Sequence, residues 1–279
     1  MKKIILTFVL LISISQHAKA TTWMTSFEDA KKLSIATNKL ILIDFWATWC
    51  YPCQKMEADT WRTPEVESLL SAYIPLKIDI DVFRKISNKY SANRIPYVLI
   101  VDAYGEVVFN ETGYKTKEQM LKVLKKYTIN TKVFQNDFAS FYKKQTPEIA
   151  LSLGEKYLDA SIYLKGKIKY DFLKLGGIYF KKIKKLTSKK EYKQKYSQKV
   201  NLLAGAYKLL IKGKNEKALK YLDKNFKEVE ILPENKVLFD FIGFAAYNKL
   251  KDKENAKIWY EKLKTDKNYK TYLSKSRKI

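Results

Sequence analysis

The stretch Asp44-Phe45-Trp46-Ala47-Thr48-Trp49-Cys50-Tyr51-Pro52-Cys53 decides the fold. It continues the apolar run of residues 40–43, and a run of this kind is typical of a strand buried on both faces of a sheet. After a short turn, Cys50 opens a helix that is predicted to run to about Thr60. The two cysteines are therefore expected where a buried strand ends and a helix begins.

Helix and strand patterns alternate on both sides of this stretch. Ser26, with Asp29 three residues later, forms a capping-box-like start to a helix that ends near Asn38. The sequence further predicts helices over residues 64–73, 83–92 and 117–127, strands over 76–80 and 97–101, and a hairpin that turns at Tyr104-Gly105 into residues 107–109. This order predicts an α/β fold, a mixed sheet with helices on both faces.

From about residue 128 onward the strand pattern disappears and helical periodicity takes over. Breaks between the helices are expected at the following positions: Gly166, Gly176-Gly177, Gly213 and Pro233. We therefore expect residues 131–279 to form an all-α domain.

Two segments of this half resemble each other. Gly205-Ala206-Tyr207 is followed by Ala218, and Gly243 is followed by Ala256, 38 residues after Ala218. Small residues on facing helices allow the helices to pack closely, as in helical-hairpin repeats. The second segment is similar to a tetratricopeptide repeat, while an ordinary helical bundle is the alternative.

The first twenty residues have the order of a secretory signal peptide. Lys2-Lys3 precedes an apolar run over residues 4–14, and a small-residue site follows at Ala18-Lys19-Ala20. The run is too short for a transmembrane helix, which needs about 20 residues. We expect residues 1–20 to be cleaved after export to the periplasm or another extracytoplasmic space, and an uncleaved anchor is the alternative.

The formal net charge of +25 lies almost entirely in the second half of the chain. Residues 1–116 hold 14 basic and 12 acidic side chains, whereas residues 117–279 hold 40 basic and 17 acidic ones, which gives +2 and +23. Such an excess can mark a nucleic-acid or membrane partner. Only four of the basic residues are Arg, the residue that phosphate sites favour. Solvated helix faces explain the excess, and no nucleic-acid binding is predicted.

The two cysteines of the chain, Cys50 and Cys53, are too close in sequence for an effective structural staple. Their position favours redox chemistry, because a helix N-terminus stabilises the thiolate that attacks a disulfide. Cys50 is therefore expected to have a lowered pKa and to be exposed. Cys53, one helical turn later and facing inward, can then attack the mixed disulfide.

A metal site is the competing hypothesis for the cysteine pair. A structural zinc site needs about four ligands, but the chain has no third cysteine and its one histidine is His17, inside the expected signal peptide. Two-thiolate binding of copper(I) stays open. No metal or other cofactor is predicted.

Residues 24–127 resemble the thioredoxin family, which implies a thioredoxin-like domain over residues 21–130. Residues 49–53 match the family's W-C-x-P-C site, Asp44 its buried aspartate, and Lys77 the lysine that accompanies the aspartate. Ile95-Pro96 matches the cis-proline loop. The flank over residues 54–66 looks closest to exported members, of which the catalytic module of the thiol:disulfide interchange protein DsbD is one.

The resemblance implies a role for each matching residue. Cys50 would be the nucleophile, Cys53 the resolving thiol, and Asp44, with Lys77 nearby, the group that takes the proton from Cys53. Substrate-binding roles are implied for the residues around the cysteines and in the proline loop: Trp49, Tyr51, Pro52, Ile95 and Pro96.

The sequence thus predicts an exported thiol–disulfide oxidoreductase that reduces protein disulfides in the cell envelope. Its partners would be disulfide-bearing proteins and a membrane or envelope thiol–disulfide electron partner. The x-Pro dipeptide favours the reducing direction, although Tyr51 replaces the family's common glycine. Two alternatives are an oxidant or isomerase, and an interaction protein whose helical domain binds a client. The sequence does not predict an oligomeric state.

Overall fold

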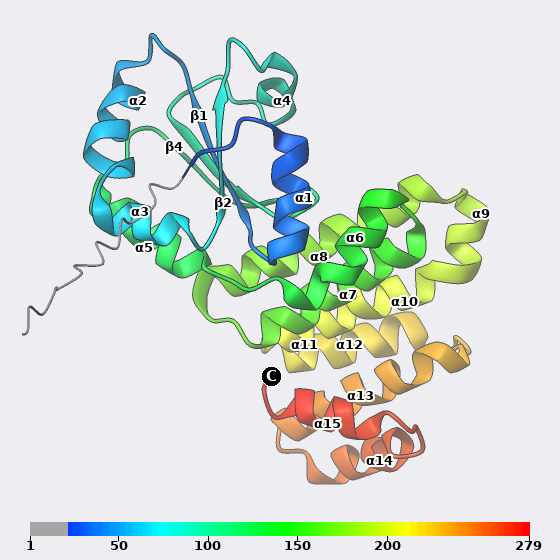
Figure 1. Ribbon diagram of the computed structural model, residues 1–279. Helices are drawn as coiled ribbons and strands as arrows, with labels where there is room; N and C mark the ends of the chain where they lie inside the picture. Colours follow the sequence, from blue (N-terminus) through cyan, green and yellow to red (C-terminus); the bar gives the residue numbers. More distant parts are fainter. Residues whose placement is uncertain (1–21) are drawn as a thin grey trace, which may run out of the picture.

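The computed structural model describes residues 22–279, so the expected signal peptide over residues 1–20 lies outside the described residues (Figure 1). A four-stranded sheet with helices occupies the first part of this range, and helices alone occupy the rest. The predicted fold class, a mixed α/β sheet followed by an all-helical region, is confirmed.

The sheet has the strand order β2-β1-β3-β4. Its strands are β1 (Ile41–Trp46), β2 (Ile74–Asp79), β3 (Tyr97–Val101) and β4 (Val107–Thr112). β1 pairs parallel with β2 and antiparallel with β3, which pairs antiparallel with β4. Because β1 and β2 are parallel, their carboxyl ends lie at one edge of the sheet. This edge, which we call the cysteine edge, carries the loop that leads to Cys50.

Helices cover both faces of the sheet, as the continuous apolar run of β1 predicts. On one face α1 (Phe27–Thr37) and α4 (Arg84–Lys89) pack on Ile41, Ile43 and Phe45. The opposite face, with Leu40 and Leu42, is covered by α2 (Tyr51–Met56), the π-helical turn η1 (Glu57–Trp61), α3 (Pro64–Leu70) and α5 (Lys117–Tyr127). Successive strand residues point to opposite faces, so both faces of β1 are buried.

Local sequence signals fix several helix ends, and two helices differ from the prediction. The Asp29 N–H donates to the Ser26 hydroxyl at 3.3 Å, as expected for the start of α1. The helix after Cys50 changes to π geometry at Glu57. α4 ends at Lys89 because Ser91 adopts a φ of 53°, which a helix cannot continue.

The second region is entirely helical. Its elements are η2 (Lys132–Phe134), α6 (Gln135–Lys143), α7 (Pro147–Ile162), α8 (Gly166–Leu186), α9 (Lys189–Glu191), η3 (Tyr192–Tyr196), α10 (Ser197–Asn201), η4 (Leu202–Tyr207), α11 (Lys208–Ile211), α12 (Asn215–Phe226), α13 (Pro233–Lys249), α14 (Lys253–Leu263) and α15 (Tyr269–Ser276). Among residues 22–279, no helix combines the length and the apolar character that crossing a membrane requires.

The break predicted at Gly176-Gly177 is wrong, because both glycines lie inside α8. A Cβ atom added to Gly176 would lie 2.2 Å from Leu158 Cδ1 and 2.9 Å from the carbonyl oxygen of Gly154, both on α7. Gly176 therefore serves the close approach of two helices and not a turn.

The two similar segments both place a glycine against an aromatic ring of the next helix. A Cβ on Gly243 in α13 would lie 2.3 Å from Trp259 Cε3 in α14, and one on Gly205 would lie 2.2 Å from Tyr221 Cζ in α12. Each pair therefore packs closely as a helical hairpin. Identity with tetratricopeptide repeats stays a prediction.

Asp102 joins the two regions at the end of β3. Its carboxylate is fully buried and accepts hydrogen bonds from the hydroxyls of Tyr157 in α7, at 2.9 Å, and Tyr179 in α8, at 2.8 Å. The backbone N–H groups of Tyr104 and Glu106 also donate to it, each at 2.9 Å. The hydrophobic core runs continuously from α5 through this contact into the helical region. The helical region thus packs on the sheet away from the cysteine edge (Figure 1).

Candidate redox site

Cys50 is the residue that begins α2, and it forms a disulfide with Cys53 with an S–S distance of 2.04 Å. The backbone N–H of Cys53 donates to Cys50 Sγ at 3.2 Å. The same N–H and the partial positive charge of the helix start would stabilise a thiolate on Cys50 in the reduced state. The cysteine pair therefore has the geometry of a reversible dithiol–disulfide couple.

The expectation that Cys50 is exposed is wrong for the disulfide state, in which its exposed fraction is 3%. The bonded sulfurs pack with Ala47 against Trp46 and Ile95. The accessible surface is instead aromatic: Trp49 is 65% exposed and Tyr51 is 72% exposed.

Asp44 lies on β1 with an exposed fraction of 4%. Burial raises the pKa of its carboxyl to about 7, and the negative charge of Glu57 acts in the same direction. The Lys77 ammonium and the Trp61 indole oppose this rise. A carboxyl group with such a pKa can both accept and release a proton near neutral pH.

Lys77 lies directly beside Asp44 on the neighbouring strand β2, but its ion-pair partner is Glu57. Glu57 also accepts from Arg62 Nε at 3.0 Å. Lys77 therefore acts on Asp44 through its charge, while Glu57 holds its ammonium group. Glu57 was not predicted as a site residue. Its position four residues after Cys53, on the same helix face, was the available signal.

Asp44, Cys53, Glu57 and Lys77 share one cavity of about 320 Å³. Trp46, Gln54, Ala58 and Arg62 complete its lining. A cavity of this size can hold water, so a proton can pass between the resolving cysteine and the Asp44 carboxyl without a direct contact between the two. Three of the four predicted catalytic residues, Asp44, Cys53 and Lys77, therefore line one cavity. The fourth, Cys50, is joined to Cys53 by the disulfide bond.

The Ile95–Pro96 peptide bond is cis, as the family resemblance implies. The Ile95 side chain packs on the cysteine pair, and the Pro96 carbonyl accepts from the Gly113 N–H at 2.7 Å. Trp49, on the other side, donates its indole N–H to Asp81 Oδ2 at 2.7 Å. The predicted substrate-binding residues thus surround the disulfide, and their contact with a substrate stays a prediction.

Among residues 22–279, no group of three or more Cys, His, Asp or Glu side chains is arranged to hold a metal ion.

A C-x-x-C disulfide at the start of the helix that follows a central strand defines a thiol–disulfide oxidoreductase site.

Comparisons with known proteins agree with this class. Residues 27–128 match the family model described as a thioredoxin-like domain. The thioredoxin of Chlamydia trachomatis is 38% identical over 98 residues, which are 34% of this chain and 87% of that protein. Thioredoxin-1 of Drosophila melanogaster is 39% identical over 70 residues, 24% of this chain and 60% of that protein. The chain belongs to the thioredoxin family.

The C-terminal domain of DsbD from Neisseria meningitidis, solved in the oxidised form, is similar at 20% identity and a TM-score of 0.33. The match covers 38% of this chain and 99% of that domain. The helical region from residue 129 onward lies outside the matched family model.

Proposed function

We propose that this thiol–disulfide oxidoreductase is exported and reduces disulfide bonds of proteins in the cell envelope. The hydrogen bond from the Cys53 N–H to Cys50 Sγ at the start of α2 carries the redox part of the proposal. The signal-like pattern of residues 1–20 supports export. The x-Pro dipeptide between the cysteines, which lacks a histidine, supports the reducing direction.

The reaction starts from the dithiol form. The Cys50 thiolate attacks one sulfur of the client disulfide, whose S–S bond breaks. The second client sulfur leaves as a thiolate and takes up a proton. Cys50 and the client are then joined by a mixed disulfide. The start of α2 lowers the free energy of the attacking thiolate.

Resolution of the mixed disulfide needs the thiolate of Cys53. Asp44, ionised and facing the shared cavity, accepts the Cys53 proton through water. Cys53 then attacks Cys50 Sγ, the remaining client sulfur leaves and is protonated, and the Cys50–Cys53 disulfide forms. Two electrons have passed to the client. An envelope or membrane dithiol must return them to the pair.

The equilibrium reduction potential of the Cys50–Cys53 pair tests the direction. Trp49 fluorescence in dithiothreitol buffers supplies the signal, because Trp49 directly precedes Cys50. A potential near about −250 mV or lower supports the reductase. A potential of about −120 to −180 mV contradicts it and identifies an oxidant or isomerase.

Two cysteine variants test the assignment of roles. Cys50→Ser is expected to abolish insulin reduction, since it removes the attacking sulfur. Cys53→Ser is expected to accumulate mixed disulfides with clients, since the resolving sulfur is absent. Retained turnover in Cys50→Ser would show that the nucleophile is assigned wrongly.

A further inference from the structure

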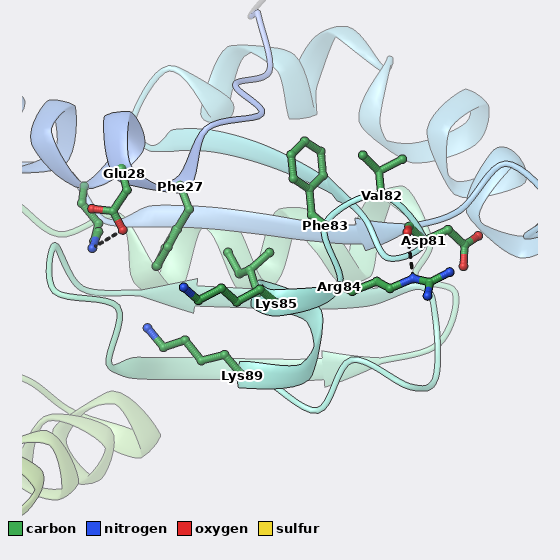
Figure 2. A pocket seen from close by; sticks show the side chains of 10 residues that line it. Phe27, Glu28, Asp81, Val82, Phe83, Arg84, Lys85 and Lys89 are labelled. Carbon is green, nitrogen blue, oxygen red and sulfur yellow. Dashed lines mark hydrogen bonds and ion pairs between the residues drawn. The ribbon is translucent and has the colours of Figure 1, made fainter.

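A second, larger depression lies between α1 and α4, on the face of the sheet that these helices cover (Figure 2). We call it the α1–α4 groove, and its volume is about 890 Å³. α4, which forms one wall, has only six residues. The groove is lined by Phe27, Glu28, Lys31, Asp81, Val82, Phe83, Arg84, Lys85, Ile86 and Lys89.

The groove begins at the cysteine edge. Asp81, at one end of it, accepts the hydrogen bond from the Trp49 indole, and Trp49 directly precedes Cys50. The loop that carries Asp81 follows β2, whose carboxyl end lies beside that of β1. A polypeptide bound at the disulfide can therefore continue into the groove without leaving the protein surface.

Apolar side chains line the groove close to this end. Val82 is 70% exposed and Phe83 is 37% exposed, while Phe27 and Ile86 form the floor between the helices. Figure 2 shows Val82 and Phe83 on the loop before α4, with Phe27 across from them on α1. Exposed apolar side chains gathered at the rim of a groove are typical of a surface that binds another polypeptide.

The charged side chains of the groove are not balanced. Glu28 pairs with Lys31 at 2.7 Å, and Asp81 receives Trp49. Among residues 22–279, Lys85 and Lys89 have no carboxylate partner within ion-pair distance. Lys89 Nζ instead lies 5.0 Å from the ring centres of Phe27 and Tyr90. Burial, Lys31 and Lys182 lower the pKa of Lys89, and the charges of Glu106 and Asp102 oppose this in part. An anion bound beside Lys89 would stabilise its ammonium group further.

From the exposed apolar side chains and the two lysines without carboxylate partners, we propose that the α1–α4 groove binds a segment of the client protein. This segment is acidic and rich in apolar residues, and it lies next to the client's disulfide. The proposal rests on the proposed function and adds a substrate class to it. Apolar client side chains would cover Val82 and Phe83, and client carboxylates would pair with Lys85 and Lys89.

Charge complementarity favours a client over the other occupants. A second copy of this chain carries a net charge of +25 and would be repelled by the two lysines. Residues 1–20 contain Lys2, Lys3 and Lys19 but no acidic residue, so they do not complement the groove either.

Binding of two matched peptides to the full chain tests the proposal. Both peptides carry Leu and Phe around a serine that replaces the client cysteine, and one has three glutamates where the other has three lysines. Fluorescence anisotropy is expected to show about tenfold tighter binding of the glutamate peptide at low salt, because its carboxylates can pair with Lys85 and Lys89. The preference is expected to shrink at 0.5 M salt.

A charge-reversal variant locates the binding site. Lys85→Glu/Lys89→Glu is expected to lose the preference for the glutamate peptide. The control is Lys249→Glu/Lys267→Glu, which has the same net charge and should keep the preference. Its two positions lie far from the groove, at the end of α13 and after α14. Equal binding of the two peptides by the unaltered chain overturns the proposal, and so does a preference that survives in the first variant.

Failure of the groove is distinguishable from failure of the proposed function. Reduction of hydroxyethyl disulfide, which is small and neutral, by the unaltered chain tests the cysteine pair alone. If the chain reduces it but binds both peptides equally, the groove proposal fails and the proposed function stands. The peptide-binding arm needs no redox step, because the peptides contain no sulfur to exchange.

Discussion

Asp44 is a buried carboxyl group that lines the same cavity as Cys53. β1 places it one strand away from Lys77 and beside the cavity that Cys53 lines. Its pKa of about 7 is the result of burial that two neighbouring charges only partly modify. The protein therefore maintains, in its core, a group whose ionisation costs folding free energy.

The cost gives a pH-dependent prediction for Asp44→Asn. The pKa rises from 3.8 in the unfolded chain to about 7 in the folded one, so stability falls as the pH rises from about 4 to about 7 and stays lowered above that range. Relative to the unaltered protein, Asp44→Asn is expected to gain about 2–4 kcal/mol between pH 4.5 and pH 8. Urea unfolding of both oxidised proteins at the two pH values measures this gain.

The buried Asp102, whose pKa is raised to about 6 by burial and by Glu106, titrates in both proteins, so its contribution cancels in the comparison. A stability difference that is independent of pH would mean that Asp44 is ionised throughout the range.

Glu57→Gln is expected to lower the pKa of Asp44. The substitution removes a negative charge that raises this pKa. It also frees the Lys77 ammonium from its ion pair with Glu57, and the positive charge of Lys77 then stabilises the Asp44 carboxylate more strongly. Carbon-detected NMR titration of the Asp44 carboxyl measures the shift. Glu65→Gln, on the exposed start of α3, serves as the control and should leave the titration unchanged. An unchanged or raised Asp44 pKa in Glu57→Gln would contradict the assignment.

At the residue scale, the sequence selects candidate site residues but does not predict their surroundings. Cys50, Cys53, Asp44 and Lys77 could be chosen from spacing and resemblance, because motif spacing reflects backbone geometry. The burial of Cys50 and the pairing of Lys77 with Glu57 depend on side-chain packing across the sheet and the helix, which spacing does not encode.

At the scale of elements, the close packing of α7 on α8 depends on the absence of a single Cβ atom. Gly176 faces α7, where a methyl group would meet the Leu158 side chain and the Gly154 carbonyl. Gly177, the next residue, has open space around it, with the Lys208 ammonium 3.9 Å from the position of a Cβ. Two adjacent glycines thus have opposite structural roles.

Gly176→Ala is expected to destabilise the protein by about 1–3 kcal/mol, because the backbone carbonyl of Gly154 cannot move aside easily. Gly177→Ala is expected to stabilise it by up to about 1 kcal/mol, since alanine favours the helix interior. Thermal unfolding of the two variants measures both effects. Equal effects of the two substitutions would contradict the packing of α7 on α8 described above.

Element positions followed from periodicity where one residue pattern dominates. The buried run before Cys50 predicts β1, and Ser26 predicts the start of α1. Gly176-Gly177 looked like a break, because glycine has the same sequence signature in a turn and in a tight helix contact. Only the neighbouring helix distinguishes the two uses.

At the scale of the molecule, Asp102 and the aromatic side chains around it make the sheet and the helical region one folding unit. Four hydrogen bonds converge on a carboxylate that is shared by a strand end and two helices. This contact could not be predicted from the sequence, since Asp102, Tyr157 and Tyr179 are far apart along the chain and carry no motif.

The unaltered protein is therefore expected to unfold in a single transition, and Asp102→Ala in two. The substitution leaves two buried tyrosine hydroxyls without their acceptor and removes a polar contact that both α7 and α8 make with the end of β3. Tryptophan fluorescence follows mostly the sheet region, because Trp23, Trp46, Trp49 and Trp61 lie there and Trp259 alone lies in the helical region. Far-UV circular dichroism follows mostly the helical region. Coincident transitions in Asp102→Ala would show that the remaining contacts between the two regions, such as Tyr127–Asp171 and Lys182–Glu106, couple them without Asp102.

The position of the helical region also determines which end of the molecule stays accessible when the other end is bound. α13, α14 and α15 lie at the end of the molecule far from Cys50 and Cys53 (Figure 1). A partner bound to these helices would therefore leave the cysteine edge accessible. For the proposed oxidoreductase, one cysteine pair at this edge would serve both the electron donor and the client, so the two exchanges would alternate in time.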